Sequence, residues 1–591
     1  MHSSPQRVSI ASMSRFRGFR ALLIGVLLIV AIAARLIPGA RTIDDAFITF
    51  RYARNIVEGQ GFVYNPGVST LGTTTPLFTL LLTAASALSG SRDFPQIAIV
   101  LSAAADAVTA ALLYAIARRV MAGMRVGGEP GGASSGRAEA RPYEEILAAL
   151  PGLLWAVSPM SVTFAVGGME TSVSILWMTA AVAAFLAGPS AGWVKPAGDP
   201  PGRPYGDGGD RQRRSDWDAK AGDPPGRPYE AALGIFAALG LLTRADAVLW
   251  AAPLLGWQLV ERLAARRGRL TLAALPWRTW IACTVILLPW AVYATAAFGS
   301  PIPNSVTAKR YAYLIPDGAA LIRMIQTYAT PFFEFDTFGS LGAMFASVAY
   351  LLLSLVAISF AARRAPRLLP WLIYPWLYLV VFAVLNPLIF RWYMAPPLPA
   401  LMMGIVVGAW ALTSVFRRTP LRWALLGAAG VLWLFMSING WTLHPDHGTD
   451  RPAPRMAFHA LELEYQRMAE YLRDDLGVTE TTRVASGDIG AVGYFSRATI
   501  IDTVGLVTPE LTRYYPVDPA LVAADQNYAI PPALIYDTQP EYLVTMEGFV
   551  RQGLAREARF LADYRLIREQ PFPFYGTAMQ LFQRQEASST D

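Results

Sequence analysis

Long apolar runs separated by short polar breaks occupy the first three quarters of the chain. A helix that crosses a bilayer needs about 20 apolar residues. Runs that meet or nearly meet this length predict about 11 transmembrane helices, at residues 20–38, 95–118, 146–165, 170–188, 230–244, 246–262, 276–298, 338–362, 367–388, 392–415 and 421–441. Residues 1–441 are therefore predicted to form a polytopic α-helical membrane domain.

Mixed composition begins near residue 442 and continues to residue 591. Helical periodicity runs from Leu461 to Leu476, and short strand-like runs follow near 483–486, 499–501 and 542–545. Strands that alternate with helical stretches favour a small α/β domain. The sequence thus predicts a second domain over residues 442–591.

Composition supports the membrane assignment, since 54% of the residues are hydrophobic and only 16% are charged, against about 25% charged in soluble domains. The basic residues form short clusters between apolar runs instead of one basic face, so topology explains the net charge better than nucleic-acid binding does. The single cysteine, Cys283, excludes an intramolecular disulfide and a cysteine-based zinc site.

With the N-terminus in the cytoplasm, every basic cluster lies inside, as the positive-inside rule requires. The first run, 20–38, is then an uncleaved transmembrane helix. The stretch 76–89 must not span, and its length favours an interfacial helix. This topology places outside the membrane residues 39–94, the turn at 167–170, residues 299–337 and the C-terminal domain.

Two segments on the predicted cytoplasmic side have low complexity. Residues 120–142 are rich in Gly, Ala, Ser and Arg, and residues 189–229 contain the nonamer AGDPPGRPY twice. Such segments cannot bury a core, so both are predicted to be disordered loops.

The first predicted outer loop contains an amphipathic helix. Ile43, Phe47, Phe50 and Val57 recur at helical spacing, and the glycines at 59 and 61 would end the helix. We expect this helix to lie along the outer membrane surface.

Two adjacent carboxylates, Asp44 and Asp45, begin this helix. Capping is one explanation, because Thr42 and Asp45 approximate a capping box and acids favour the first turn. The other is a base or metal site beside Arg51 and Arg54, facing a membrane-embedded cavity. The two explanations are compatible.

The run DDAFITFRYARN at 44–55, followed by GQGFVYNPG at 59–67, resembles the first extracytoplasmic loop of the GT-C glycosyltransferases. It is most similar to the arabinofuranosyltransferases of actinobacterial cell walls and related bacterial enzymes. Further landmarks follow in the family's order: GGMET at 167–171, LTRADA at 242–247, FGSPIPNSVTAK at 298–309 and RWY at 391–393. The loop VSTLGTTTP at 68–76 departs from the pattern of many relatives, which affects acceptor and sugar preference.

The resemblance implies an enzyme of the bacterial cytoplasmic (inner) membrane that works at the outer face. It implies a polyprenyl-phosphate-linked sugar as donor and a cell-envelope glycan, lipid or protein as acceptor. The C-terminal domain would be extracytoplasmic and would hold the acceptor beside the cavity.

Sugar transfer from a lipid phosphate needs a base for the acceptor hydroxyl. Either Asp44 or Asp45 fits that role, with Asp45 preferred, and Glu170 is a further carboxylate for the same cavity unless it only favours a helix start. Asp44 and Glu170 together are candidate ligands for a divalent cation, Mg, Mn or Ca.

The departing phosphate needs positive charge. Candidates at the outer interface are Lys309, Arg310 and Arg391, with Tyr393 beside them. Arg391 also fits an interfacial anchor. Other cavity candidates are Arg51, Arg54, Arg244, Asp246 and Asn304; Arg244 and Asp246 alternatively neutralise each other.

Two further groups are weaker. His444, Asp446 and His447 form a possible metal cluster in a polar linker, and the glycines of 487–493 lack the dinucleotide-binding spacing. A polytopic lipid or solute transporter is the alternative function, although the chain shows no inverted repeat and its charged candidates gather at one face. A non-catalytic envelope scaffold would leave the carboxylates dispensable.

Overall fold

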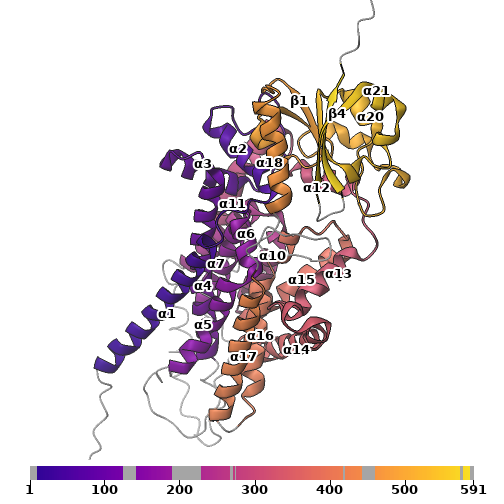
Figure 1. Ribbon diagram of the computed structural model, residues 1–591. Helices are drawn as coiled ribbons and strands as arrows, with labels where there is room; N and C mark the ends of the chain where they lie inside the picture. Colours follow the sequence, from indigo (N-terminus) through magenta and orange to yellow (C-terminus); the bar gives the residue numbers. More distant parts are fainter. Residues whose placement is uncertain are drawn as a thin grey trace, which may run out of the picture.

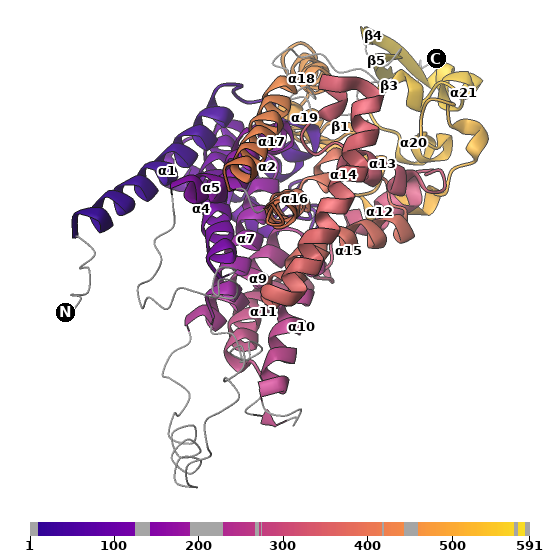
Figure 2. The same ribbon diagram turned by 90° about the horizontal axis from the view of Figure 1, so that it is seen from below.

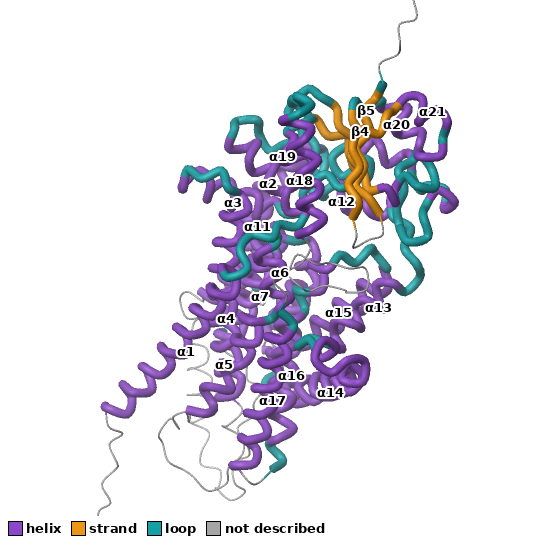
Figure 3. The backbone as a smooth tube through the Cα atoms, in the orientation of Figure 1, coloured by secondary structure: helices purple, strands orange, loops and turns teal. Residues whose placement is uncertain are grey.

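The computed structural model describes residues 10–123, 142–188, 228–265, 271–272, 275–416, 419–441, 459–572 and 577–585. Figure 1 shows a bundle of long helices with a smaller domain at one end. Strands occur only in that smaller domain within the described ranges (Figure 3). The predicted loops within 120–142 and 189–229, apart from the helix ends that border them, fall outside these ranges, as do His444, Asp446 and His447.

Each of the predicted membrane segments forms a helix. By length and composition, 7 helices in the described part of the chain can cross a membrane, and 8 if the bent pair α5 (Pro142–Val157) and α6 (Pro159–Val166) is one span. Helices α7, α9 and α10 fall outside that test, so fewer segments than expected qualify as full spans. The helices of the bundle are α1 (Ile10–Leu36), α4 (Phe94–Gly123), α5 (Pro142–Val157), α6 (Pro159–Val166), α7 (Thr171–Ala187), α9 (Pro228–Thr243), α10 (Val248–Ala265), α11 (Trp277–Phe298), α14 (Glu334–Arg364), α15 (Leu369–Leu385), α16 (Leu398–Thr413) and α17 (Thr419–Asn439).

A buried ion pair joins α1 to α4 inside the bundle. Arg35 Nε donates to Asp106 Oδ2 at 3.0 Å, and both side chains are 0% exposed. Trp155 of α5 and Ser172 of α7 also donate to the Asp106 carboxylate, at 3.1 and 2.8 Å. Because the carboxylate is satisfied from three other helices, Asp106 serves packing. The N-terminal end of α1 projects outward (Figure 2), but Arg20 in that half of the helix still donates to Glu145 of α5 at 2.8 Å.

Short helices gather at the end of the bundle that carries the small domain (Figure 1). They are α2 (Asp44–Val57), α3 (Pro76–Ser89), α12 (Asn304–Ala312) and α13 (Ala319–Ala329). As predicted, α2 ends just before Gly59 and Gly61, whose φ angles are +82° and +89°. Its surroundings differ from the expectation, because Ala46 to Asn55 are all buried. The C-terminal domain covers the side that we expected to face solvent.

The C-terminal domain contains the predicted α/β arrangement. A 5-stranded sheet has the order β2-β1-β3-β5-β4, in which β1 pairs in parallel with β2 and β3. The antiparallel hairpin of β4 and β5 extends the sheet beyond the strands that the sequence predicted. The elements are α18 (His459–Asp474), β1 (Arg483–Ser486), α19 (Gly490–Ser496), β2 (Thr499–Asp502), α20 (Pro532–Thr538), β3 (Tyr542–Met546), α21 (Ala558–Asp563), β4 (Tyr564–Phe572) and β5 (Thr577–Arg584).

Helix α19 lies against α2, and two glycines allow the approach. A Cβ at Gly490 would stand 1.8 Å from the Asp44 carbonyl oxygen. A Cβ at Gly493 would stand 2.0 Å from the Tyr64 hydroxyl. The glycine spacing of 487–493, which does not fit a nucleotide site, therefore serves the contact between the two domains.

Candidate functional site

A cavity of about 370 Å³ opens where the first loop, the membrane helices and the C-terminal domain meet. Its volume is in the range of small-molecule sites, roughly 300–1,000 Å³. Leu506 is the lining residue from the C-terminal domain. The polar and aromatic residues that line the cavity are Asp45, Thr49, Thr73, Thr74, Thr75, Glu170, Arg244, Asp246, Ser305, Lys309, Phe382, Trp392 and Tyr393.

Asp45 and Lys309 form an ion pair in this cavity, with 3.0 Å between Lys309 Nζ and Asp45 Oδ2. The Lys309 ammonium also lies 4.3 Å from the centre of the Phe390 ring. Burial opposes the charge on Lys309, but the Asp45 carboxylate prevails and raises the lysine's pKa. The pair therefore brings a carboxylate and an ammonium group to one place.

Asp44, the other candidate base, faces the C-terminal domain. Its Oδ2 accepts a hydrogen bond from the Gly490 amide at 3.0 Å, and its Oδ1 accepts one from the Ala491 amide at 2.7 Å. It does not line the cavity. Burial and, secondarily, the charge of Asp488 raise the pKa of Asp44 to about 8. Asp44 thus caps the first turn of α19.

The capping box that offered the simpler explanation of the two aspartates is not formed. Ile43 occupies the N-cap position of α2, and no side chain caps the helix. Asp44 caps a helix in the other domain, and Asp45 turns toward Lys309. The predicted capping box is therefore wrong, although both aspartates lie in the first turn of α2, where the helix dipole favours acids.

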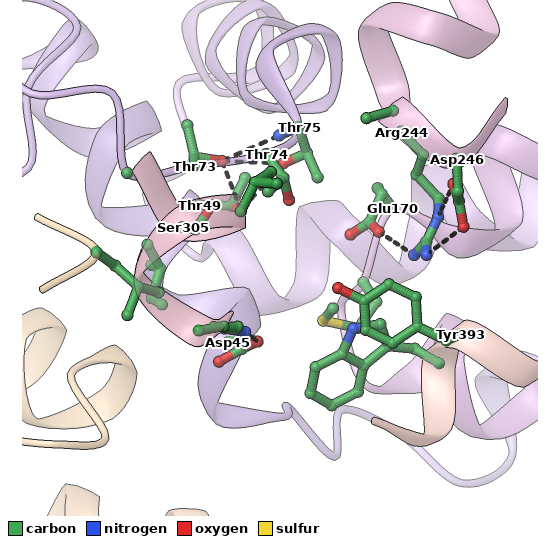
Figure 4. A pocket seen from close by; sticks show the side chains of 18 of the residues that line it. Asp45, Thr49, Thr73, Thr74, Thr75, Glu170, Arg244, Asp246, Ser305 and Tyr393 are labelled. Carbon is green, nitrogen blue, oxygen red and sulfur yellow. Dashed lines mark hydrogen bonds and ion pairs between the residues drawn. The ribbon is translucent and has the colours of Figure 1, made fainter. Parts of the chain in front are cut away.

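Glu170, Arg244 and Asp246 form a charged group on the opposite side of the cavity (Figure 4). Arg244 donates to Glu170 Oε1 at 2.7 Å and to both Asp246 oxygens at 3.0 and 2.8 Å. Tyr378 donates to Asp246 at 2.9 Å, and the Arg244 guanidinium lies 5.1 Å from the centre of the Tyr393 ring. One arginine thus binds two carboxylates and offsets the charge of one of them. The predicted pairing of Arg244 with Asp246 is confirmed, and both residues also line the cavity.

Hydroxyl groups line another part of the cavity wall. The Thr49 hydroxyl lies 3.2 Å from that of Thr75, and the Thr73 and Thr75 hydroxyls are 3.1 Å apart. These residues were not among the predicted site residues. The departure of 68–76 from the family pattern was the signal that could have identified them.

Arg51 and Arg54 do not line the cavity, contrary to expectation. Arg51 donates to the carbonyl oxygens of Gly493 and Ala498, each at 2.7 Å. Arg54 donates to the Tyr494 carbonyl oxygen at 2.7 Å. Both arginines bind backbone carbonyl oxygens of the C-terminal domain. The residues next to them in the sequence do not predict these partners.

Three other candidates lie near the cavity without lining it. Arg310 is exposed, although Lys309 beside it points inward. Arg391 is partly buried, and its neighbours Trp392 and Tyr393 are the lining residues. The Asn304 backbone amide donates to the Leu71 carbonyl oxygen at 2.9 Å, which ties the start of α12 to the loop that carries Thr73, Thr74 and Thr75.

The contacts of the expected cation ligands do not fit a shared metal. Both Asp44 carboxylate oxygens accept hydrogen bonds from backbone amides, and the Glu170 carboxylate accepts one from the Arg244 guanidinium. Among the residues that the structure describes, no three His, Cys, Asp or Glu side chains are grouped to hold a metal ion. A divalent cation between Asp44 and Glu170 stays a prediction without support from these contacts.

Comparisons with known proteins address the fold. Residues 457–586 match a family model described as a domain of unknown function (DUF8728). No curated protein matches the chain.

Two solved structures are similar to nearly the whole chain. The oligosaccharyltransferase AglB from Archaeoglobus fulgidus, in complex with an inhibitory peptide and a dolichol-phosphate, has a TM-score of 0.53 at 12% identity, over 97% of this chain and 74% of AglB. ArnT from Cupriavidus metallidurans, bound to undecaprenyl phosphate, has a TM-score of 0.49 at 13% identity, over 95% of this chain and 98% of ArnT. The likeness to AglB concerns the fold alone, a helical bundle that carries a C-terminal domain, and agrees with the predicted architecture.

Proposed function

We propose that the chain is a membrane glycosyltransferase that moves a sugar from a polyprenyl-phosphate-linked donor to a cell-envelope acceptor. Asp45 is the general base, and Lys309 binds the donor phosphate. The transferred sugar is a pentosyl or hexosyl group, and the resemblance of the first loop to arabinofuranosyltransferases favours a pentose.

One observation carries this proposal. A carboxylate and an ammonium group lie 3.0 Å apart inside a cavity of about 370 Å³ between apolar helices and a soluble domain. Such a cavity gives a lipid phosphate a positive partner and gives an acceptor hydroxyl a base. The fold adds a precedent, since AglB was solved with a dolichol-phosphate.

In the proposed reaction, the acceptor oxygen forms a bond to the anomeric carbon while the bond from that carbon to the phosphate oxygen breaks. The bonding electron pair leaves with the polyprenyl phosphate, which gains one negative charge. The acceptor proton moves to the Asp45 carboxylate. Lys309 offsets the charge that develops on the phosphate.

The charged group of Glu170, Arg244 and Asp246 fixes the geometry of the opposite side of the cavity. Because Arg244 already binds Glu170 and Asp246, its role is to position these carboxylates and the Tyr393 ring. We assign no proton transfer to Glu170. The acceptor approaches from the C-terminal domain at the outer face of the bacterial inner membrane, with the N-terminus in the cytoplasm.

The test is incubation of the purified chain with a panel of polyprenyl-phosphate sugars and envelope acceptors, with and without a chelator. We expect release of polyprenyl phosphate with at least one sugar, and loss of that release in Asp45→Asn. Purified protein that releases no lipid phosphate from any donor, or an Asp45→Asn variant with full activity, would contradict the proposal. A loss of activity with the chelator would restore the case for a cation.

A further inference from the structure

The sheet of the C-terminal domain has a position that suits ligand binding. Strand β1 lies between β2 and β3 and runs parallel to both, so the chain goes from β1 to β2 on one side and returns to β3 on the other. In open α/β sheets, ligands bind outside the carboxyl ends of the strands where the strand order reverses in this way. Asp488 stands at this point, two residues after β1 ends at Ser486 and before α19 begins at Gly490.

The contacts between the two domains bring this end of the sheet to the first turn of α2. The Gly490 and Ala491 amides bind the Asp44 carboxylate in that turn. Asp488 directly precedes the segment that is fixed there. It therefore lies near Asp45, the next residue of α2.

The charges that act on Asp488 also place it beside the proposed catalytic pair. Partial burial raises the pKa of its carboxyl, the hydrogen bond from Tyr465 opposes that shift, and the charges of Asp45 and Lys309 act in opposite directions. For Lys309, burial lowers the pKa, whereas Asp45 and, more weakly, Asp488 raise it. Asp488 does not line the cavity of about 370 Å³. It lies on the C-terminal-domain side of the pair, outside the space proposed for the donor.

One oxygen of Asp488 is fixed, and the other is open. The hydroxyl of Tyr465, which is buried on α18, donates to Asp488 Oδ2. Asp488 Oδ1 has no hydrogen-bond partner among the described residues, and the residue is partly exposed. A carboxyl group that is held in one orientation with a free oxygen can accept a hydrogen bond from a ligand at small entropic cost.

A second carboxyl group in the same place also lacks a donor. Glu462 of α18 is 4% exposed, and its Oε2 has no hydrogen-bond partner among the residues that the structure describes. Burial raises the pKa of Glu462, as do the charges of Asp44 and Asp488. A buried oxygen without a partner carries a free-energy cost. This side of the domain junction is therefore short of hydrogen-bond donors.

The two aspartates suit a ligand that has two hydroxyl groups close together. In the proposed reaction, Asp45 takes the proton of the hydroxyl that accepts the sugar. Asp488 Oδ1 is free to accept a hydrogen bond from a second hydroxyl. A sugar ring carries neighbouring hydroxyls, whereas a serine or threonine side chain has only one.

We infer that Asp488 binds the acceptor, and that the acceptor is a glycan with a free hydroxyl beside the one that receives the sugar. The inference rests on the proposed function, because it places the acceptor between Asp45 and the C-terminal domain. Asp488 accepts a hydrogen bond and takes no proton during the transfer.

The test measures transfer from the polyprenyl-phosphate sugars by the full chain in detergent. The acceptors are octyl glycosides of a pentose and of a hexose, analogues of each that lack one hydroxyl, and a serine-containing peptide. We expect at least one glycoside, and not the peptide, to accept the sugar. Loss of the hydroxyl beside the accepting one should raise the acceptor KM about 10- to 100-fold, as when a hydrogen bond to a charged group is lost.

Variants of Asp488 show whether this hydroxyl and the carboxyl group bind each other. Asp488→Ala should raise the KM of the complete glycoside by a similar factor and leave that of the deoxy analogue unchanged, because the contact is already absent there. Asp488→Asn keeps an acceptor oxygen and should retain part of the preference. Binding of polyprenyl phosphate alone should not weaken in either variant, which also reports that each is folded.

Asp537→Ala is the matched control. Asp537 of α20 is exposed, accepts a hydrogen bond from the Tyr514 hydroxyl and does not line the cavity. Its removal takes a tyrosine-bound carboxylate from the same domain at a different position. The KM values of the complete glycoside and of its analogue should both stay unchanged.

The outcomes separate the inference from the proposed function. A chain that releases no polyprenyl phosphate from any donor overturns both. Transfer to the peptide alone, or to no glycoside, overturns the inference only. The inference also fails if Asp488→Ala weakens the complete glycoside and the deoxy analogue equally, since that result assigns Asp488 to the shape of the domain junction. Should Asp488→Ala lose polyprenyl phosphate binding, the same comparison in Asp488→Asn decides, because loss of the charge should reduce the penalty for the missing hydroxyl.

Discussion

Asp44 and Asp45 are adjacent, yet they serve different parts of the molecule. Successive residues of an α-helix point about 100° apart, so two neighbours meet different surroundings. Asp44 accepts the amides of Gly490 and Ala491, whereas Asp45 pairs with Lys309 in the cavity. The division of roles follows from the position of α19, which the first loop by itself does not reveal.

Replacing each aspartate in turn with asparagine distinguishes the proposed base, Asp45, from the residue that binds α19, Asp44. Asp45→Asn removes the proposed base, and we expect kcat to fall by about 10²- to 10⁴-fold, the usual contribution of a general base. Asp44→Asn keeps an acceptor oxygen for α19, so transfer should persist at a reduced level. Single-turnover release of polyprenyl phosphate measures both. Equal losses in the two variants would contradict the assignment.

The two neighbouring basic residues of α12 give a matched pair for the phosphate role. Lys309→Gln removes a charge inside the cavity, and we expect the donor KM to rise about 10- to 100-fold, as when a hydrogen bond to a charged group is lost. Arg310→Gln removes the same charge from an exposed position and should change KM little. If both variants behave alike, long-range attraction of the anionic donor explains the effect instead.

At the scale of elements, α2 shows what periodicity can and cannot reveal. The apolar spacing and the two glycines predicted its position and its end. The same pattern suggested that Arg51 and Arg54 face a cavity, but both donate to backbone carbonyl oxygens of 493–498. When an arginine binds carbonyl oxygens more than 400 positions away in the chain, the residues around that arginine give no signal of the contact.

The contact between α2 and α19 depends on small residues. Gly493→Ala would bring a Cβ to within 2.6 Å of the Arg51 guanidinium and closer still to Tyr64. We expect overpacking to cost about 1–3 kcal/mol and to lower the melting temperature. Gly427→Ala on α17 has open space around it and is the control. Unchanged melting of Gly493→Ala in detergent would show that the two helices separate easily.

The buried pair of Arg35 and Asp106 is the second contact between elements that can be tested. Asp106→Leu leaves the Arg35 charge without its partner in the bundle, and we expect a loss of about 3–5 kcal/mol. The double variant Arg35→Met/Asp106→Leu removes both charges and should recover most of that loss. Thermal unfolding of the three proteins in one detergent measures the difference. A double variant as unstable as the single one would assign the loss to shape and not to charge.

At the scale of the whole molecule, hydropathy located the helical segments of the bundle, although fewer of them than predicted qualify as full spans. The predicted domain boundary near residue 442 lies outside the described residues. Hydropathy did not reveal the hairpin of β4 and β5, because β4 carries polar residues such as Arg565, Arg568 and Glu569 in place of a clear alternation. The cavity was foreseen only through the resemblance of separate motifs. Its lining residues come from segments that lie far apart in the chain, and physical spacing rules do not connect them.

The junction of the two domains carries an acidic group that links stability to pH. Glu462 of α18 accepts the Asp44 amide at 3.4 Å, and the charge of Asp488 helps to raise the pKa of Asp44. That pKa is about 8 in the folded protein against an ordinary value of 3.8. Between these values the folded chain binds more protons than the unfolded chain, so its stability falls as the pH rises.

We therefore expect the melting temperature to be lower at pH 9 than at pH 6, by a few degrees for each kcal/mol lost. Asparagine at position 44 cannot ionise, so Asp44→Asn should reduce the difference in melting temperature between pH 6 and pH 9. Burial also raises the pKa of Glu462 and Asp488, whose titration acts in the same direction, so some difference should persist. Melting followed by intrinsic fluorescence in one detergent at both pH values is the measurement. A wild-type chain that is more stable at pH 9 would mean that these carboxylates are ionised at the domain junction throughout this range, and that the amides of α19 satisfy Asp44 as an anion.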